Sequence, residues 1–496
     1  MDEYKYFVKQ IILVGITSIL VSLSPLILLP IISKSLGAAN YGIWIQFNNT
    51  ITLIPAIAAL GLPYTMVRFL SASQNPEEIK ETFYTIAFLV IMGCLFVAVL
   101  LLIFYQPIAD VLFQGNFIVS LVLPVCIFIA GLILLSFDFF RTFNQMKSYS
   151  FFTFLNAYLI IIIVSFSLFL GYGITGAVFG FLIAQIIIFA AMYLLIISKI
   201  GFTLPKFHNI RAYLNFGLPT IPSNISFWIL DITDRYLIGL LLGLSFVGYY
   251  SGGYLLGSII SILLSPFYTV LLPILSQYYA QNNVRRIKSL INHSIKFFLI
   301  MAIPSVFILT ILSKPLLLLL STPNMALNGY LITPIVAVGG LFFGLYGIIS
   351  QIIFLERKTQ ITGNIWLISI VLNLVMDLTF GFYFGIIGIA VTTLLVYLFA
   401  FIVTLHYSFK FLRCNFYFGF ISKTIVASIL MSGLLVILNP IGPLNILFGV
   451  VLSFLVYVVL LWLLGGIRRE ELLLFKDILR DVLERLTRPI LGFKNN

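Results

Sequence analysis

Charged residues are scarce in this sequence. Of its 496 residues, only 9% are Asp, Glu, Lys or Arg, whereas soluble domains carry about 25%. Apolar residues make up 61%, and a chain of this composition cannot bury them in one water-excluded core. Uncharged stretches recur along the whole length, each close to the ~20 residues with which a helix spans a bilayer. The composition therefore excludes a soluble protein and predicts an all-α polytopic membrane protein.

Cysteine and histidine are also rare. The three cysteines form no CxxC pair and the three histidines are far apart, so neither type offers a disulfide framework, a redox site or a metal site. The nucleotide-binding pattern GxxxxGK[ST] is absent. The net charge is +12, but the basic residues are scattered between apolar stretches rather than grouped with aromatic residues. We therefore predict no cofactor, no metal and no nucleic-acid partner.

Apolar runs between charged or turn-rich breaks predict fourteen transmembrane helices. In chain order they cover 10–33, 41–66, 82–106, 116–137, 151–171, 173–198, 214–241, 246–277, 294–312, 329–354, 361–383, 386–409, 420–438 and 445–466. Of the 28 Lys and Arg residues, only Lys34 and Lys314 fall in odd-numbered links, and Arg235 lies within a helix. Because cytoplasmic links are enriched in Lys and Arg, we predict a multi-pass protein of the cell membrane with both termini in the cytoplasm. After the last helix, apolar residues recur at helical spacing between 472 and 486, which predicts an amphipathic helix on the membrane surface.

The sequence contains an internal repeat. Leu36-Gly37 and Tyr41-Gly42 are echoed by Leu242-Gly243 and Val247-Gly248 at an offset of 206 residues, and 173–176 is echoed by 385–388. Collinear matches of this kind predict two copies of a six-helix unit. Since six is even, both copies enter the membrane from the same side, which is the parallel-repeat arrangement of many transporters. The predicted domains are an N-terminal six-helix bundle in 1–206, a C-terminal six-helix bundle in 207–415, two extra helices in 416–466 and a cytoplasmic tail in 467–496.

Four pairs of glycines have the GxxxG spacing that lets helices approach closely. They are Gly176/Gly180, Gly253/Gly257, Gly340/Gly344 and Gly381/Gly385. We interpret these pairs as contacts within the chain rather than as a dimer interface.

One segment resembles a known family. The resemblance rests on Gly217-Leu218-Pro219, Asp234-Arg235, Leu242-Gly243 and Val247-Gly248-Tyr249-Tyr250-Ser251. Together these resemble the seventh and eighth helices of Wzx-type lipid-linked oligosaccharide flippases, within the multidrug, oligosaccharidyl-lipid and polysaccharide exporter (MOP) superfamily. The helix count and the six-plus-six repeat are similar to that family over about residues 5 to 466.

The resemblance implies a function. It implies a flippase, not an enzyme, that moves polyprenyl-diphosphate-linked oligosaccharide to the outer leaflet by alternating access, for cell-surface polysaccharide biosynthesis. It also implies contact with membrane lipids, and it leaves open an association with a polysaccharide polymerase or with glycosyltransferases.

A charged side chain at the centre of a membrane helix raises the free energy of insertion by about 2.5 to 3.5 kcal/mol, so each such residue needs a structural or functional explanation. Asp231, Asp234 and Arg235 fall in the seventh predicted helix, and Asp377 falls in the eleventh. Asp231 and Arg235 are four residues apart and can pair on one helix face, so two interpretations stay open: mutual neutralisation with Arg235 extending to the outer interface, or a polar substrate site. Asp377 has no basic neighbour within a turn. It needs Arg235 from another helix as its partner or it is protonated, and we predict it as the ion-coupling residue.

The first bundle offers further candidate residues. Arg68 lies at the cytoplasmic end of the second predicted helix, and Asn48 and Asn49 belong to the most polar run of any predicted helix. A diphosphate headgroup needs cationic or amide donors, and arginine binds phosphate oxygens with two parallel hydrogen bonds. We predict Arg68 and Arg235 as the main headgroup contacts. The weaker candidates for substrate binding are Asn48, Asn49, Asn224, Lys34, Arg141, Asp231 and Asp234.

Two other functions stay open at this point. An ion-coupled multidrug exporter of the same superfamily typically carries an acidic residue in its first helix, and 10–33 contains none. A membrane glycosyltransferase or polymer ligase needs acid and base residues and usually a sizeable outer loop, whereas the predicted outer links are short. The flippase is therefore the favoured interpretation.

Overall fold

The computed structural model describes residues 13–71, 75–207 and 209–466. Every regular element in this part is a helix. The N-terminal half contains α2 (Ser24–Ala58), α3 (Leu62–Leu70), α4 (Pro76–Ile103), α5 (Tyr105–Phe113), α6 (Phe117–Thr142), α7 (Met146–Phe169), α8 (Gly173–Ile200) and α9 (Ile210–Gly217). The C-terminal half contains α10 (Thr220–Leu241), α11 (Leu244–Gly257), α12 (Ile259–Ile262), α13 (Ser265–Ala280), α14 (Val284–Leu320), α15 (Pro323–Gly329), α16 (Ile332–Leu355), α17 (Thr359–Ser408), α18 (Phe418–Leu438) and α19 (Pro443–Leu463). The predicted amphipathic tail helix lies outside the described residues.

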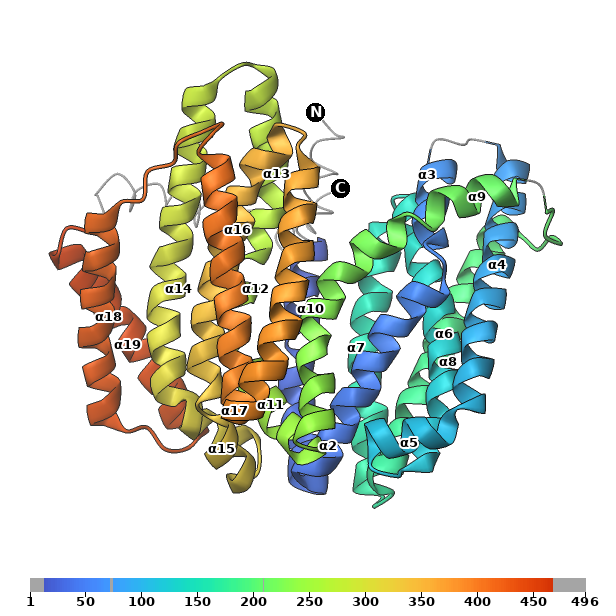
Figure 1. The fold of residues 1–496 in the computed structure, drawn as a ribbon, viewed down its shortest axis with the longest axis horizontal. Coiled ribbons are helices and arrows are strands. Elements are labelled where there is room, and N and C mark those ends of the chain that lie inside the picture. The colour runs from blue at the N-terminus through green and yellow to red at the C-terminus, as the bar shows by residue number, and fades with distance from the viewer. Residues whose placement is uncertain (1–12, 72–74, 208, 467–496) are drawn as a thin grey trace, which may run out of the picture.

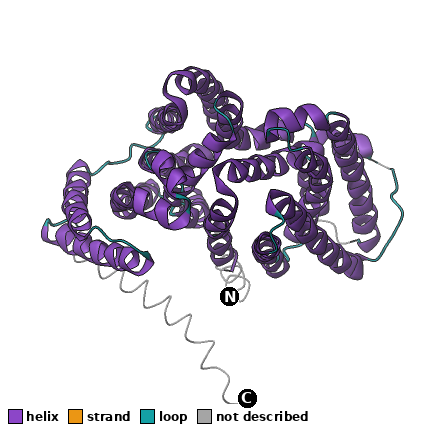
Figure 2. Ribbon diagram, turned by 90° about the horizontal axis from the view of Figure 1, so that it is seen from below, coloured by secondary structure: helices purple, strands orange, loops and turns teal. Residues whose placement is uncertain are grey.

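The helices form two groups, which we call the N-lobe (α2–α9) and the C-lobe (α10–α19). In Figure 1 the lobes meet at the lower end, where α2, α10 and α11 lie between them, and they diverge toward the upper end. Figure 2 shows the molecule from the lower end, with the two groups adjoining at the centre. One buried apolar cluster joins side chains of α2 and α6 to side chains of α11, α16 and α17, whereas two other clusters lie within one lobe each.

Two long helices reverse direction at a glycine. The backbone of Gly37 in α2 (φ 78°, ψ −179°) and of Gly385 in α17 (φ 61°, ψ −144°) is not helical. A positive φ of this kind is readily adopted by glycine alone. Each of these two helices therefore covers two of the predicted membrane helices. Ten helices in the described part are long and apolar enough to cross a membrane, which agrees with a multi-pass membrane protein.

Three predicted membrane helices are broken where continuous helices were expected. The stretch 41–66 breaks at Leu60 and Gly61, which have φ of 55° and 67°, and 214–241 breaks between α9 and α10. The stretch 246–277 is divided into α11, α12 and α13. A proline lies in the first turn of α3 and of α13, and Pro219 directly precedes α10, whereas the break between α11 and α12 has no proline. Proline favours the start of a new helix because it lacks an N–H and fits the first turn.

The link between the lobes is held by the N-lobe. Lys206 forms an ion pair with Glu81 of α4, and the carbonyl of Lys206 accepts a hydrogen bond of 2.8 Å from Thr85 Oγ1. The hydrogen bond and the charge of Glu81 raise the pKa of Lys206 above its usual value. A Cβ atom added at Gly61, before α3, would lie 2.1 Å from the carbonyl oxygen of Gly217 in α9. The link and α9 therefore follow the N-lobe up to the start of α10.

Close packing at a GxxxG pair is confirmed within the C-lobe. A Cβ atom added at Gly253 would lie 2.3 Å from the carbonyl oxygen of Gly329, and one added at Gly257 would lie 2.7 Å from Cβ of Val336. Both neighbours belong to the same chain, in α15 and α16. This pair therefore marks an intramolecular contact, as its spacing predicts.

We expect Gly253→Ala to destabilise the C-lobe. The added methyl group would overlap the Gly329 carbonyl, and overpacking of this kind typically costs about 1–3 kcal/mol. The matched control is Gly433→Ala in α18, where no atom lies within 4 Å of an added Cβ. Thermal unfolding of both variants in detergent would measure the effect. Equal melting temperatures for the two variants would contradict the close contact.

Candidate functional site

Two adjacent charged residues are buried in α10, at the boundary between the lobes. Asp234 is 1% exposed and Arg235 is 7% exposed. Helix α10 packs against α17 of its own lobe and against α2 of the N-lobe. Because charges at bilayer depth are costly, these two residues require specific partners.

The carboxylate of Asp234 is held by two hydroxyl groups from different helices. Its Oδ2 atom accepts hydrogen bonds from Tyr250 Oη of α11 at 2.5 Å and from Thr393 Oγ1 of α17 at 2.9 Å. Its Oδ1 atom is buried and has no hydrogen-bond partner within the described residues. Oδ2 of the carboxylate is therefore fixed by two hydroxyl groups, whereas Oδ1 is buried without such support.

Asp377 lies beside Asp234. It is fully buried, and its carboxyl group interacts electrostatically with that of Asp234. Neither of its oxygens has a hydrogen-bond partner in the described ranges, and the same holds for the amide nitrogen of Asn373, one turn earlier on α17. Two carboxylates this close in an apolar environment cannot both carry an unbalanced charge. The arrangement is therefore suited to bind a proton or a small cation.

Arg235 does not serve as the partner of Asp377 in this structure, contrary to one prediction. Its guanidinium carbon lies 3.9 Å from the ring centroid of Tyr254 and 5.4 Å from that of Tyr250, both on α11. The charged neighbour of Asp377 is instead Asp234. Since Arg235 is buried, its side chain also does not extend to the outer surface. A cation over aromatic rings has a favourable environment.

Two polar side chains of α2 reach α10. Gln46 Nε2 donates a hydrogen bond of 2.7 Å to the carbonyl oxygen of Arg235. Thr50 Oγ1 and Tyr236 Oη are hydrogen-bonded at 2.7 Å. The turn of α10 that follows Asp234 is therefore tied to the N-lobe.

The other candidates in α2 and α3 are dispersed. Arg68 is exposed in the last turn of α3. Lys34 Nζ donates a hydrogen bond of 2.6 Å to the carbonyl oxygen of Leu319 in α14. Asn48 Nδ2 donates to the Trp44 carbonyl of its own helix, whereas the amide nitrogen of Asn49 is buried without a partner within the described residues.

The remaining candidates lie elsewhere. Arg141 is paired with the buried Asp138 at 3.0 Å in α6. The side chains of Asn224 and Asp231 lie outside the part of the chain that the structure describes. The predicted site residues therefore separate into a central set around Asp234 and Arg235 and several isolated ones.

Two residues of the site were missed by sequence analysis. Tyr250 and Thr393 hold Asp234 from positions 16 and 159 residues away, so no local pattern connects them to it. Sequence analysis also missed the buried Asp138 in α6, which lies apart from this site and directly follows the predicted helix 116–137; its spacing of three from Arg141 was the available signal.

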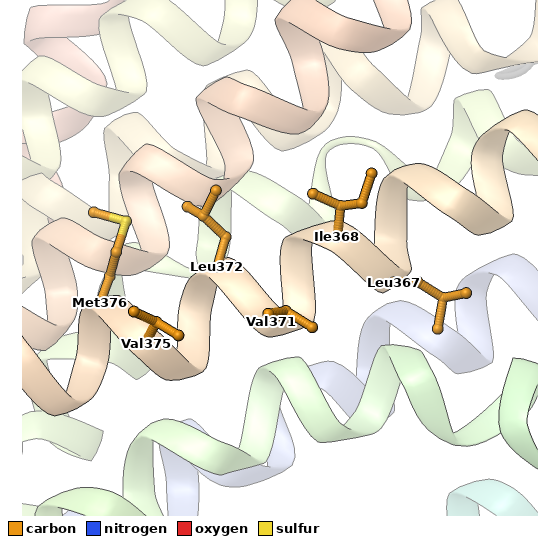
Figure 3. Close-up of a pocket in the computed structure, with 6 residues that line it drawn as sticks. All are labelled: Leu367, Ile368, Val371, Leu372, Val375 and Met376. Carbon is orange, nitrogen blue, oxygen red and sulfur yellow. The ribbon is translucent and has the colours of Figure 1, made fainter.

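An apolar pocket lies on the flank of α17. Its volume is about 500 Å³, and its lining comes from six residues of the first half of α17, shown in Figure 3: Leu367, Ile368, Val371, Leu372, Val375 and Met376. None of the polar candidates lines it. The pocket is therefore a surface for apolar groups, separate from the carboxyl pair, although Met376 directly precedes Asp377.

Two solved structures are similar to this fold. A structure described as "Lipid II flippase MurJ, inward closed conformation" has a TM-score of 0.70 at 19% identity and covers 91% of this chain and 98% of its own. A structure described as an inward-facing multidrug resistance MATE family transporter of the MOP superfamily has a TM-score of 0.62 at 16% identity and covers 79% of this chain and 93% of its own. The chain therefore shares the fold of these two solved structures.

The family follows from the sequence comparisons. The family described as "Polysaccharide biosynthesis protein" matches residues 7–279, which is more than half of the chain, and the chain belongs to it. The MatE family matches residues 219–379. A curated relative, "Probable low-salt glycan biosynthesis flippase Agl15" of Haloferax volcanii, is 26% identical over 292 residues, which is 58% of this chain and 61% of the relative. These relatives are flippases and transporters, so the predicted resemblance and the prediction of a protein that is not an enzyme are confirmed.

We expect Tyr250→Phe to weaken the support of Asp234. A buried hydrogen bond to a charged group is typically worth about 1.5–3 kcal/mol, so the melting temperature should fall. The matched control is Tyr249→Phe, because Tyr249 Oη only accepts a hydrogen bond of 3.0 Å from the exposed Asn324. Thermal unfolding in the same detergent measures both variants. A control that is destabilised as strongly as Tyr250→Phe would contradict the assigned role.

Proposed function

We propose that this chain is a flippase that moves polyprenyl-diphosphate-linked oligosaccharide from the cytoplasmic to the outer leaflet, for cell-surface polysaccharide biosynthesis. The observation that carries this proposal is a buried guanidinium, that of Arg235, at the boundary between two lobes of a polysaccharide-biosynthesis family member. A diphosphate cannot cross an apolar barrier without a counter-charge, and such a position offers one. The low-salt glycan flippase among the relatives supports the same substrate class.

We propose that the chain crosses the membrane fourteen times, as a six-plus-six repeat followed by two helices. Two pairs of glycines at repeated positions support this layout. Gly37 and Gly243 have φ of 78° and 98°, and Gly173 and Gly385 have φ of 62° and 61°. The proposed domains are 1–206, 207–415, 416–466 and the tail 467–496. In Figure 1, α18 and α19 lie at the edge of the C-lobe, away from the N-lobe.

The end at which the lobes diverge is proposed to face the cytoplasm. The start of α4, the end of α8 and the start of α14 lie at that end, and they contribute Lys80, Lys199 and Arg285. By the preference of Lys and Arg for cytoplasmic links, the conformation is open to the cytoplasm and closed on the outer side. Both termini are then cytoplasmic, in the cell membrane.

Arg235 is the proposed central contact of the headgroup, and Arg68 is the proposed contact at the inner mouth. Asn49, with a buried and unpartnered amide nitrogen, is suited to bind sugar hydroxyl groups. Lys34 and Arg141 are less suited, because they are engaged with Leu319 and Asp138. The proposed partners are the lipid-linked oligosaccharide and membrane lipids, together with polymerase or glycosyltransferase machinery.

Transport is proposed to be coupled to a proton or a small cation at Asp234 and Asp377. Their carboxyl groups are adjacent, and three of the four buried oxygens have no hydrogen-bond partner among the described residues, which supports this role. Occupation by a cation would balance the paired negative charges in the apolar interior.

A multidrug exporter is the second candidate function. The MatE match over residues 219–379 and the MATE structure favour it, because both concern the same superfamily. The two candidates differ in the groups that would hold the substrate: Arg235 for an anionic headgroup, and the carboxyl groups of Asp234 and Asp377 for a cationic drug. The two candidate functions predict different phenotypes of a deletion strain and can therefore be distinguished in cells.

We expect Arg235→Gln to reduce surface glycan at least about tenfold in a deletion strain, while the protein reaches the membrane in normal amounts. The loss of the central cation would leave the headgroup without its counter-charge, and about tenfold corresponds to 1.4 kcal/mol. Surface glycan and inner-leaflet lipid-linked oligosaccharide would both be quantified. The control is Arg413→Gln, at an exposed arginine between α17 and α18.

Two outcomes would overturn the proposed function. One is a deletion strain with normal glycan and increased retention of cationic dyes, which would favour the exporter. The other is full complementation by both Arg235→Gln and Arg68→Gln, which would exclude these cations as headgroup contacts.

The orientation predicts the reactivity of single cysteines in a cysteine-free background. Lys147→Cys and Arg286→Cys should be protected from an impermeant maleimide in intact cells and labelled after permeabilisation. Tyr172→Cys, at an exposed position between α7 and α8, should be labelled in intact cells and serves as the control. Labelling of Lys147→Cys or Arg286→Cys from outside would contradict the fourteen-helix layout.

A further inference from the structure

One stripe of α2 makes a continuous contact with the C-lobe. Ala38, Gly42, Gln46 and Thr50 are spaced by four residues, and residues at this spacing lie on the same face of a helix. Each of them meets a group of α10 or α11. The stripe runs from the end at which the lobes meet toward the level of Asp234.

The first part of the stripe is a reciprocal contact between the two repeat copies. A Cβ atom added at Gly42 would lie 2.0 Å from the carbonyl oxygen of Leu244, and one added at Gly248 would lie 2.3 Å from the carbonyl oxygen of Ala38. Ala38 and Leu244 each follow a turn glycine, Gly37 or Gly243. The same positions of both copies therefore meet each other, and neither glycine leaves room for a side chain.

The outer side of this contact is covered by α14. Lys34 Nζ and Ser33 Oγ donate to the carbonyl oxygens of Leu319 and Leu320, at 2.6 Å and 3.4 Å. These carbonyls belong to the last turn of α14 and have no partner within their own helix. We call the set of Ala38, Gly42, Leu244 and Gly248 the outer closure.

The second part of the stripe reaches the carboxyl pair through α10. Gln46 donates to the backbone carbonyl of Arg235, the residue after Asp234, and Thr50 is bonded to Tyr236. A Cβ atom added at Gly239, one turn further, would lie 2.6 Å from Gln46 Nε2, so the amide also packs tightly against α10. The hydrogen bonds of Gln46 and Thr50 therefore connect the turn of α10 that follows Asp234 to the same face of α2 that forms the outer closure.

We propose that Gln46 and Thr50 are positioning residues that couple occupancy of the Asp234–Asp377 carboxyl pair to the outer closure. The inference rests on the proposed ion coupling. In this structure the closure is formed and the two carboxyl groups are adjacent, an arrangement that a bound proton or cation stabilises. A ligand that binds one conformation better shifts the population toward it. Occupancy therefore favours the outer-closed state, and loss of the cation releases α10 and opens the closure.

The test measures the distance between spin labels at the closed end. Tyr172→Cys and Leu327→Cys are placed in a cysteine-free background, because these positions are 65% and 55% exposed and lie in different lobes. Pulsed electron paramagnetic resonance in lipid nanodiscs gives the ratio of closed to open molecules. The effect of Na⁺ is measured by comparing Na⁺ with choline at pH 8. The effect of protons is measured by comparing pH 5.5 with pH 8, both in choline.

Few other groups near the pair can respond to these conditions. Besides Asp231, whose side chain lies outside the described part, the neighbouring charged or titratable groups are Arg235 on α10, Tyr250 on α11 and Tyr41 on α2. Ordinary arginine and tyrosine side chains do not change charge between pH 5.5 and 8. Arginine and tyrosine are therefore excluded as the source of a response in this range. Asp377→Asn should remove a response of the carboxyl pair, whereas a response of Asp231 would persist in that variant.

In the parent double-cysteine protein, we expect saturating Na⁺ or pH 5.5 to raise the closed-to-open ratio about tenfold or more, a population shift of about 1.4 kcal/mol. Gln46→Leu and Thr50→Val should reduce this response to about twofold or less, because each removes one bond between α2 and α10. The matched controls are Asn40→Leu and Thr52→Val. Their side chains donate only to carbonyls of their own helix, at 3.0 Å and 2.9 Å, so the response should remain.

The closure itself is tested by Gly42→Ala. Its added methyl group should keep the outer end open with or without cation, whereas Gly433→Ala should behave like the parent. A parent-like cation response in both Gln46→Leu and Thr50→Val, no response in the parent protein, or a closed Gly42→Ala variant would each overturn the proposal. Glycan export by the same proteins is scored separately. A cation-dependent closure without glycan export would overturn the proposed function and leave this inference standing.

Discussion

Water is absent from the core of a bilayer, so a buried polar group of this chain is costly unless it has a partner within the protein or a bound ligand. Asp234 depends on this constraint most directly, because Tyr250 and Thr393 reach it from two other helices. The arrangement of α10, α11 and α17 around that carboxylate brings Asp377 beside it and places Arg235 over Tyr254. The candidate site is thus built around the hydrogen bonds that hold the buried carboxylate of Asp234.

The same constraint shapes the boundary between the lobes. Apolar burial contributes little to association between helices in lipid, because lipid tails are as apolar as side chains, so close backbone contact and hydrogen bonds matter more. Gly42 and Gly248 bring α2 and α11 into contact with backbone carbonyls, and Gln46 donates to a backbone carbonyl of α10. Besides the apolar cluster that joins the lobes, the contact of α2 with α10 and α11 thus consists of small residues and single hydrogen bonds. Such contacts suit the proposed separation of the lobes during transport.

Apolar and charged side chains also occupy different places in the structure. Exposed large hydrophobic side chains occur on most of the long helices, as suits contact with lipid, whereas Asp234, Arg235 and Asp377 are buried at α10 and α17. The apolar pocket on α17 ends one residue before the buried Asp377, so an apolar surface and a buried carboxyl group adjoin along one helix.

Much of this protein could be predicted from the sequence, because the relevant signals are local. That the chain is a membrane protein follows from apolar stretches about as long as a bilayer span. The repeat follows from glycines that recur at nearly constant sequence offsets. Arg235, Asp234 and Asp377 were identified as candidates because charge within an apolar run is conspicuous. The pairing of these residues was not accessible in this way. Arg235 and a proton were the two alternatives predicted to balance Asp377, which lies beside Asp234, and Thr393 reaches Asp234 from 159 residues away. Such contacts depend on how helices rotate and cross, which is set by packing among all of them, and no periodicity within one segment carries that information.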